Sequence, residues 1–207
     1  MSAGEVLWRG KSKIRDLKDR YRFALGLPPA VPSYNETIKT DRGICLSDFR
    51  VGEWTREGAN DQEIEWLKEV VARANKILEH RFSFFNLQDH YLGDPIDWNK
   101  DHESGKHAPL CFSPSIDYRD FRVTGDAKIV WEPNRHHQLV VLGRAYRVTG
   151  NIHYAEEIVE QIESWLEQCP FGMGMNWRSP LELAIRLINW VWAIDLIRDS
   201  GIVTPEF

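Results

Sequence analysis

The sequence predicts an all-α fold of stacked or ring-closed helical hairpins, interrupted by a long loop region rich in aromatic residues. Two observations favour this class. Apolar residues recur every three or four positions in several segments, and helix start and stop signals alternate through the last third of the chain. The hairpins have no strict internal repeat, and one hairpin takes about 50 residues, longer than the ~34 of a tetratricopeptide unit.

The composition is that of an ordinary globular domain. The 207 residues are 43% hydrophobic and 28% charged, which excludes disorder for most of the chain. The net charge of −5 gives no overall positive field to hold nucleic acid or an anionic membrane. Nine Trp residues suit either sugar faces or the filling of a large helical core.

Several sites and signals are not predicted. Cys45, Cys111 and Cys169 are odd in number and widely spaced, which argues against a disulfide framework and against structural zinc. No stretch approaches the ~20 apolar residues of a membrane span, and the first residues contain no apolar h-region. The sequence as given therefore predicts no export signal, and the localisation stays open.

Residues 1–34 are expected to form a basic N-terminal helix followed by a Pro-rich linker. Residues 1–22 contain seven Lys or Arg against three acidic residues, and one helical face is apolar. That face consists of Ile14, Leu17, Tyr21 and Ala24. We expect a surface helix docked on the core, with an anion-binding arm as the alternative. Pro28, Pro29 and Pro32 mark the linker.

Residues 35–207 are expected to form the main helical domain. Residues 35–60 show no sustained period and predict a loop with short extended pieces. From Asp61 a helix is predicted, because Ile64, Leu67, Val71, Ala74 and Leu78 recur at helical spacing. Residues 81–127 then lose periodicity and contain several Gly and Pro residues, so they predict the long aromatic loop region. Loops of this length within a domain are often functional.

Three helices are predicted after this loop. The first enters through Pro133 and ends at Gly150, a natural residue at the C-terminal end of a helix, and the second ends at Cys169 before Pro170. The third starts with Ser179 as N-cap, Pro180 at the first helical position and Glu182 two residues on, which is a capping box.

The third of these helices is apolar nearly all round, which predicts an inner helix buried on several sides. Glu182, Arg186 and Asn189 form its only polar stripe. The stripe is either a Glu182–Arg186 pair within the helix or a lining for a polar cavity. Thr204, Pro205 and Glu206 repeat the helix-start pattern, so we expect the N-terminal portion of a longer all-α protein.

Two segments are candidates for a site. Trp131–His136 and Gly174–Arg178 both precede or open predicted helices, where free backbone N–H groups favour anions, and each contributes a Trp and an Arg. They are expected to line one mouth. The structural alternatives are that Asn176 only caps a turn and that Trp131 and Trp177 only pack. No phosphate-binding loop or zinc-protease motif occurs, and the irregularly spaced acids and histidines of residues 97–107 predict no metal site.

At these residues the sequence resembles a known family, over about residues 60–207. The motif elements are Ile96-Asp97-Trp98, Trp131-Glu132-x-Asn134-Arg135-His136, Ala145-Tyr146-x-x-Thr149-Gly150, Tyr154-Ala155, Ser164-Trp165 and Asn176-Trp177-x-Ser179-x-Leu181-Glu182-x-Ala184-x-Arg186. In order and spacing they resemble the N-terminal domain of heparinase II/III-type polysaccharide lyases. The resemblance implies an α/α toroid, here incomplete, followed by a β-sandwich domain, and β-elimination of a uronic-acid-containing polysaccharide.

The resemblance also implies roles for individual residues. Asn176 matches the residue that neutralises the uronate carboxylate, where one donor is worth ~10²–10³ in rate. Arg135 and His136 would bind acidic groups, Trp131 and Trp177 would lie under sugar rings, and the matching Asn134 and Arg186 would complete the substrate site.

The resemblance places the proton-transferring Tyr and His of these lyases beyond Phe207. We therefore expect the isolated chain to be inactive and to require the remaining toroid helices and the β-sandwich as partners. An acidic polysaccharide is the expected substrate, heparin-like or alginate-like, and no cofactor, metal or nucleic acid is expected. The alternative is a non-catalytic helical module that binds a glycan or serves as a scaffold.

Overall fold

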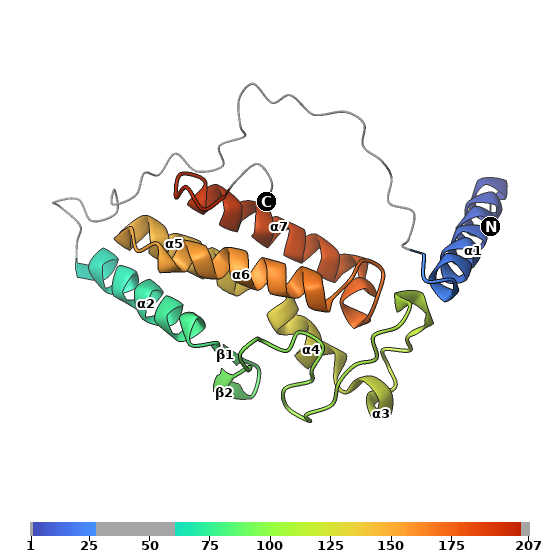
Figure 1. The fold of residues 1–207 in the computed structure, drawn as a ribbon, viewed down its shortest axis with the longest axis horizontal. Helices are drawn as coiled ribbons and strands as arrows, with labels where there is room; N and C mark the ends of the chain where they lie inside the picture. Colours follow the sequence, from blue (N-terminus) through green and yellow to red (C-terminus); the bar gives the residue numbers. More distant parts are fainter. Residues whose placement is uncertain (1, 28–60, 204–207) are drawn as a thin grey trace, which may run out of the picture.

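Figure 1 shows the computed structural model, which describes residues 2–27 and 61–203. The expectations for the Pro-rich linker, the 35–60 loop, Cys45 and the helix start at Thr204 lie outside the described residues. The elements in order are α1 Ala3–Ala24, α2 Asp61–Leu78, β1 Arg81–Phe84, β2 Leu87–Tyr91, η2 Ser113–Ser115, α3 Phe121–Thr124, α4 Ala127–Asn134, α5 His137–Thr149, α6 His153–Gln168, η3 Met175–Trp177 and α7 Pro180–Ile197. The prediction of an all-α fold is confirmed. Within the described ranges, no helix is long and apolar enough to cross a membrane.

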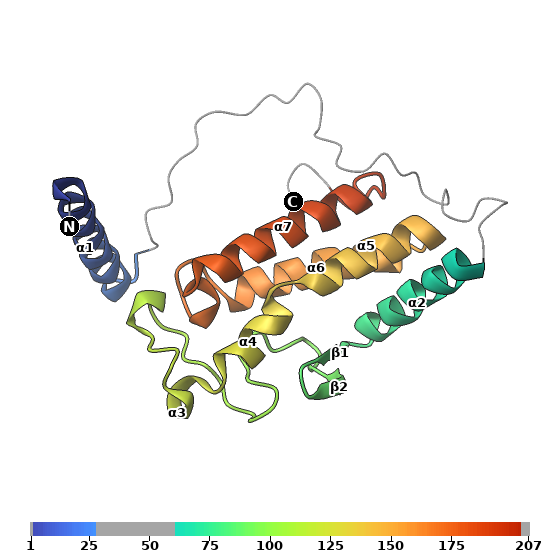
Figure 2. The same cartoon turned by 180° about the vertical axis from the view of Figure 1, so that it is seen from behind.

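Helix α5 lies at the centre of the domain. It packs against α7, α2 and α6, and the long helices run side by side in both views (Figures 1 and 2). The hairpin β1–β2 and the short helices α3 and α4 gather at one end of these helices. The main core joins α2, α5, α6 and α7, with Leu139, Leu142, Ile158 and Trp165 among its fully enclosed side chains.

The helix ends follow local sequence chemistry. Helix α5 ends at Gly150, whose left-handed backbone (φ 70°) suits glycine. Helix α6 ends at Cys169, immediately before Pro170, as predicted. The predicted helix from Asp61 is confirmed as α2, and it buries Val70, Ala74 and Ile77.

The predicted entry of a helix through Pro133 is wrong. Pro133 lies in the last turn of α4, a helix that starts after Asp126, whose side chain accepts a hydrogen bond from the Lys128 amide. His136 then takes a left-handed conformation (φ 61°), and α5 begins at His137. The sequence predicted a helix start at Pro133 because proline favours the first turn of a helix, whereas here it lies in the last turn of α4.

The 81–127 region is more ordered than the predicted loop. It forms the antiparallel hairpin β1–β2 and two short helical turns, and it is tied to α6 at Trp98, which is fully buried. The Trp98 backbone amide donates to Gln168 Oε1 (3.2 Å), and the indole Nε1 donates to Ser164 Oγ (3.2 Å). Long-range contacts of this kind hold the region in place without helical periodicity.

Two predictions of burial are corrected. Helix α7 is not buried on several sides, because α5, α6 and α4 pack on one side of it and leave a face of 42–63% exposed side chains. That face comprises Leu181, Leu187, Ile188, Val191 and Trp192. Helix α1 does not dock its apolar face on the core, since no residue of α1 is buried.

A histidine links the end of α2 to α6. His80 Nδ1 lies 2.7 Å from the Gly93 carbonyl oxygen and Nε2 lies 3.3 Å from Glu157 Oε1, so only the protonated ring donates to both. The hydrogen bond to Glu157 raises the pKa of His80 above 6.5, helped by the Gly93 carbonyl and opposed by burial.

We expect this contact to make stability depend on pH. Because the folded pKa is raised, the contribution is fully present below 6.5 and is lost as the pH rises through the folded pKa. His80→Asn, which tolerates the positive φ of 54°, should therefore cost on the order of 1 kcal/mol at acid pH and less at alkaline pH. Urea unfolding across this pH range measures it. The exposed His153→Asn is the matched control, and an equal pH dependence in both variants would contradict the assignment.

Candidate functional site

The starts of α5 and α7 lie together, as the sequence predicted for its two candidate segments. Arg135, between α4 and α5, donates through Nε to Glu182 Oε2 (2.7 Å) and through Nη2 to Glu182 Oε1 (3.0 Å). Its Nη1 bonds Glu132. This bidentate pair joins the two segments. The predicted capping box is wrong, because the Ser179 side chain makes no cap bond and Glu182 is taken by Arg135.

Arg186 supports the backbone of both segments from inside. Its Nε donates to the Asn134 carbonyl (2.7 Å), and Nη1 and Nη2 both donate to the Asn176 carbonyl (3.3 Å each). The guanidinium lies over the Trp165 ring, 4.1 Å from its centroid. Burial lowers the pKa of Arg186 to about 10, so the side chain is still a cation at neutral pH. The polar stripe of α7 thus bonds residues 134 and 135 and does not form a Glu182–Arg186 hydrogen bond within the helix.

Two asparagines donate to one carbonyl oxygen. Asn134 Nδ2 and Asn176 Nδ2 lie 2.9 and 3.0 Å from the Trp98 carbonyl oxygen. Asn134 is fully paired, since its Oδ1 accepts from Trp165 Nε1 (2.7 Å). Asn176 also donates to Cys169 Sγ (3.2 Å), but its Oδ1 is buried without a hydrogen-bond partner among the described residues. A buried unpaired amide oxygen is costly, so it needs an explanation.

His136 is enclosed by indole rings. It has no exposed surface and packs against Trp98, Trp165 and Trp190. Trp190 Nε1 donates to His136 Nδ1, which assigns the remaining proton of the neutral ring to Nε2. Burial lowers the pKa of His136 well below 6.5, and within the described part of the chain Nε2 has no hydrogen-bond partner. The ring is therefore neutral, with one unused donor.

Two tryptophans lie at the edge of this cluster. Trp131 Nε1 donates to the Met175 carbonyl (3.1 Å), and Trp177 Nε1 donates to the Cys169 carbonyl (2.9 Å). Both side chains are partly exposed. The Trp177 ring packs edge-on against Phe171, with the centroids 4.7 Å apart.

The structure brings all seven predicted site residues into one cluster. Asn134, His136, Asn176 and Arg186 lie inside it and are at most 3% exposed, whereas Trp131, Arg135 and Trp177 lie at its edge. Sequence reasoning missed the part of Trp98 and Trp190 in the cluster. Trp98 belongs to the Ile96-Asp97-Trp98 motif, but nothing in the sequence shows that its carbonyl oxygen accepts hydrogen bonds from both asparagines.

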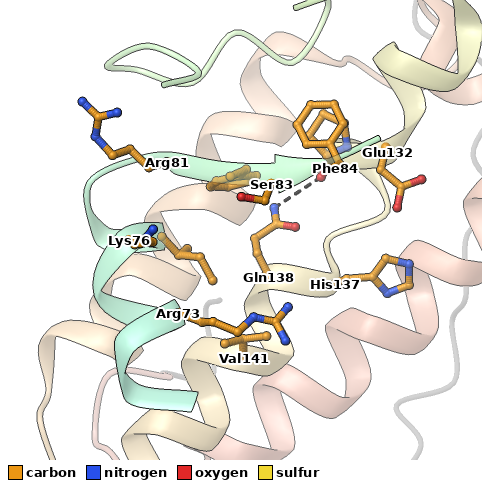
Figure 3. Close-up of a pocket in the computed structure, with 12 residues that line it drawn as sticks. Arg73, Lys76, Arg81, Ser83, Phe84, Glu132, His137, Gln138 and Val141 are labelled. Atoms are coloured by element: carbon orange, nitrogen blue, oxygen red, sulfur yellow. Dashed lines mark hydrogen bonds between the residues drawn. The ribbon is translucent and has the colours of Figure 1, made fainter. Parts of the chain in front are cut away.

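A hollow of about 150 Å³ lies beside the cluster, between α2, β1 and the α4–α5 junction (Figure 3). Its lining includes three cations and shares Glu132 with the cluster. Figure 3 shows the Arg73 side chain running toward Val141 and Gln138, whereas Arg81 reaches away from the other labelled residues. Lys76 pairs with Asp89 (3.1 Å) and Arg81 with Glu79 (3.7 Å), so Arg73 is the cation of the lining without an ion pair among the described residues.

The candidate metal residues of the 97–107 segment serve other contacts. His107 Nε2 lies 2.6 Å from Asp97 Oδ2, and Asp101 accepts bonds from Ser104 and from the Asp126 amide. In the part of the chain that the structure describes, no group of three or more His, Cys, Asp or Glu residues is placed to hold a metal ion.

The family model described as "Heparinase II/III N-terminus" matches residues 36–207. The chain belongs to the heparinase II/III N-terminal family. The match includes every residue of the cluster and leaves α1 outside it.

A heparin-sulfate lyase of Bacteroides stercoris is 28% identical over 117 residues. The alignment covers 46% of this heparinase-family chain and 17% of that lyase, so the chain corresponds to a small part of its relative. No solved structure matches.

Proposed function

We propose that the chain is the N-terminal helical part of a polysaccharide lyase that cleaves a uronic-acid-containing polysaccharide, heparin-like or alginate-like, by β-elimination. In this proposal its helices form one part of an α/α toroid that a β-sandwich domain follows. Family membership and the relative that is a heparin-sulfate lyase support it. The observation that carries it is that the two candidate segments inside the family match meet in one cluster, joined by the bidentate Arg135–Glu182 pair.

Asn176 is proposed to neutralise the substrate. Its amide would donate to the uronate carboxylate and so stabilise the charge that builds when the C5 proton leaves. The side chain has no exposed surface and its Nδ2 already donates to the Trp98 carbonyl and to Cys169 Sγ, so this contact requires the 171–178 loop to move and release one of these bonds. Gly172 and Gly174 lie within that loop at φ 76° and 75°, and they are its proposed hinge positions.

The other cluster residues are proposed to hold the polymer. The Arg135 guanidinium has five N–H donors, and Glu132 and Glu182 take three of them, which leaves two for an acidic group. Trp131 and Trp177 expose ring surface for sugars. The cationic hollow beside Glu132 suits an acidic polymer.

The test is an assay for the unsaturated uronate product by its ultraviolet absorbance. The product of the complete reading frame and the 207-residue chain are each given heparin, heparan sulfate, alginate and a neutral glucan. We expect product only with the longer protein and only on uronate polymers, because the proton-transferring residues are proposed to lie outside this chain. Product from the 207-residue chain would contradict the proposal that the proton-transferring residues lie outside it. No product from either protein would contradict the proposed lyase activity.

A second candidate is a non-catalytic module that binds a glycan or another domain. The complete burial of the Asn176 side chain and the exposed apolar face of α7 favour it. Glycan binding without any product from the longer protein would select this alternative.

A further inference from the structure

The apolar, basic and acidic side chains of helix α1 lie on different faces of the helix. At 100° per residue, Trp8 and Phe23 lie on the polar side of the helix, and the other large apolar residues fall on one stripe about 100° wide. The stripe consists of Val6, Leu7, Ile14, Leu17, Tyr21, Ala24 and the C-cap residue Leu25. Cations border both edges, with Lys11, Arg15, Lys18 and Arg22 on one side and Arg9, Lys13 and Arg20 on the other. The acids Glu5, Asp16 and Asp19 lie on the opposite face.

The apolar stripe faces away from the rest of the molecule. Phe23, which lies opposite the stripe on the helix, stacks on Phe112 with the ring centroids 6.1 Å apart. The stripe residues Leu7, Ile14 and Tyr21 are 66%, 58% and 69% exposed. Both views show α1 standing at the edge of the molecule (Figures 1 and 2). The helix is thus attached by its non-stripe face.

We propose that α1 binds an anionic lipid surface, lying flat with its stripe in the boundary between headgroups and acyl chains. An apolar stripe with a cationic border on each side is the pattern of an interfacial helix, because the long cationic side chains reach headgroup phosphates while their stems follow the apolar face. The −5 charge of the whole chain does not prevent this, because residues 1–22 carry seven Lys or Arg against three acidic residues.

Other occupants match only half of the pattern. A polyanionic glycan would use the cations but leave the stripe in water. A second copy would cover the stripe, but pairing stripe to stripe brings the cationic borders of the two helices together, which is repulsive. The proposal does not depend on the lyase activity, since α1 lies outside the matched residues 36–207.

Co-sedimentation of the 207-residue chain with lipid vesicles tests the proposal. We expect binding to vesicles that contain phosphatidylglycerol and much weaker binding to pure phosphatidylcholine. Ile14→Gln/Leu17→Gln/Tyr21→Gln keeps helix propensity, and should weaken binding about tenfold or more. Lys11→Gln/Lys18→Gln/Arg20→Gln should weaken it about a hundredfold and remove most of the salt dependence. Asp16→Asn, on the opposite face, is the control and should bind at least as tightly as the unmodified chain.

Two outcomes would overturn the proposal. If the stripe variant binds anionic vesicles as tightly as the unmodified chain, the contact is electrostatic only. If the unmodified chain is a lipid-free dimer that the stripe variant converts to monomer, the stripe is a subunit interface. Neither readout involves polysaccharide cleavage, so the result is separate from the fate of the lyase proposal.

Discussion

Arg186→Met should destabilise the chain by about 3 kcal/mol, the largest loss of stability we expect from a single substitution in the cluster. Methionine fills a similar volume but supplies no donor, so the carbonyls of Asn134 and Asn176 lose their buried partners. The stacking of the guanidinium on Trp165 is lost as well. The free energy of unfolding in urea measures the effect.

Two companion variants separate the effect of the guanidinium hydrogen bonds from the effect of the positive charge. Arg186→Lys keeps the cation but cannot reach both carbonyls, so it should recover only part of the lost stability. Arg144→Met, on the exposed face of α5, makes the same chemical change at the surface and should stay within about 0.5 kcal/mol of the unmodified chain. Equal losses at positions 144 and 186 would contradict the role assigned to Arg186.

If the longer protein is the proposed lyase, Asn176→Ala should lower its kcat/KM by about 10²–10³, the largest effect we expect on activity. The proposed reason is the loss of the amide that donates to the uronate carboxylate. The stability cost should be small, since the Trp98 carbonyl keeps the Asn134 donor and Oδ1 has no partner to lose. Rates from the absorbance assay and unfolding of the same variant in urea measure the two effects.

Asn134→Ala supplies the contrast in stability, because every polar atom of Asn134 is paired and its loss should cost more than that of Asn176. Asn86→Ala, in the exposed hairpin turn, is the control for activity and should leave the rate unchanged. A full rate in Asn176→Ala, or a loss of rate explained by unfolding alone, would contradict the neutralising role.

The sequence predicted the helices of this fold well where apolar spacing and end signals agreed. Asp61 to Leu78 and the Gly150 and Cys169 ends are examples. It failed at Pro133, which was predicted to start a helix but lies in the last turn of α4, before the left-handed His136 that precedes α5. It also failed in the 81–127 region, because Trp98 is held by contacts to residues more than 60 positions away.

The composition of the site was predictable, but its connections were not. The two segments that the sequence selected do meet, and all seven residues lie in one cluster. The partners were wrong for Glu182, which pairs with Arg135 and not with Ser179 or Arg186. Local spacing makes a pair within the helix plausible, whereas the real partner lies 47 residues away, a choice that only tertiary packing makes.

The shared acceptor at the Trp98 carbonyl has a consequence for how the chain folds. Its two asparagine donors lie 36 and 78 residues further along the chain, and Arg186 reaches back 52 residues to Asn134. Closing such long loops costs entropy before the contacts repay it, so these bonds belong to the late steps of folding. Contacts that form after the rate-limiting barrier govern mainly how fast a protein unfolds. We therefore expect the cluster to influence the unfolding rate of the domain more than its folding rate.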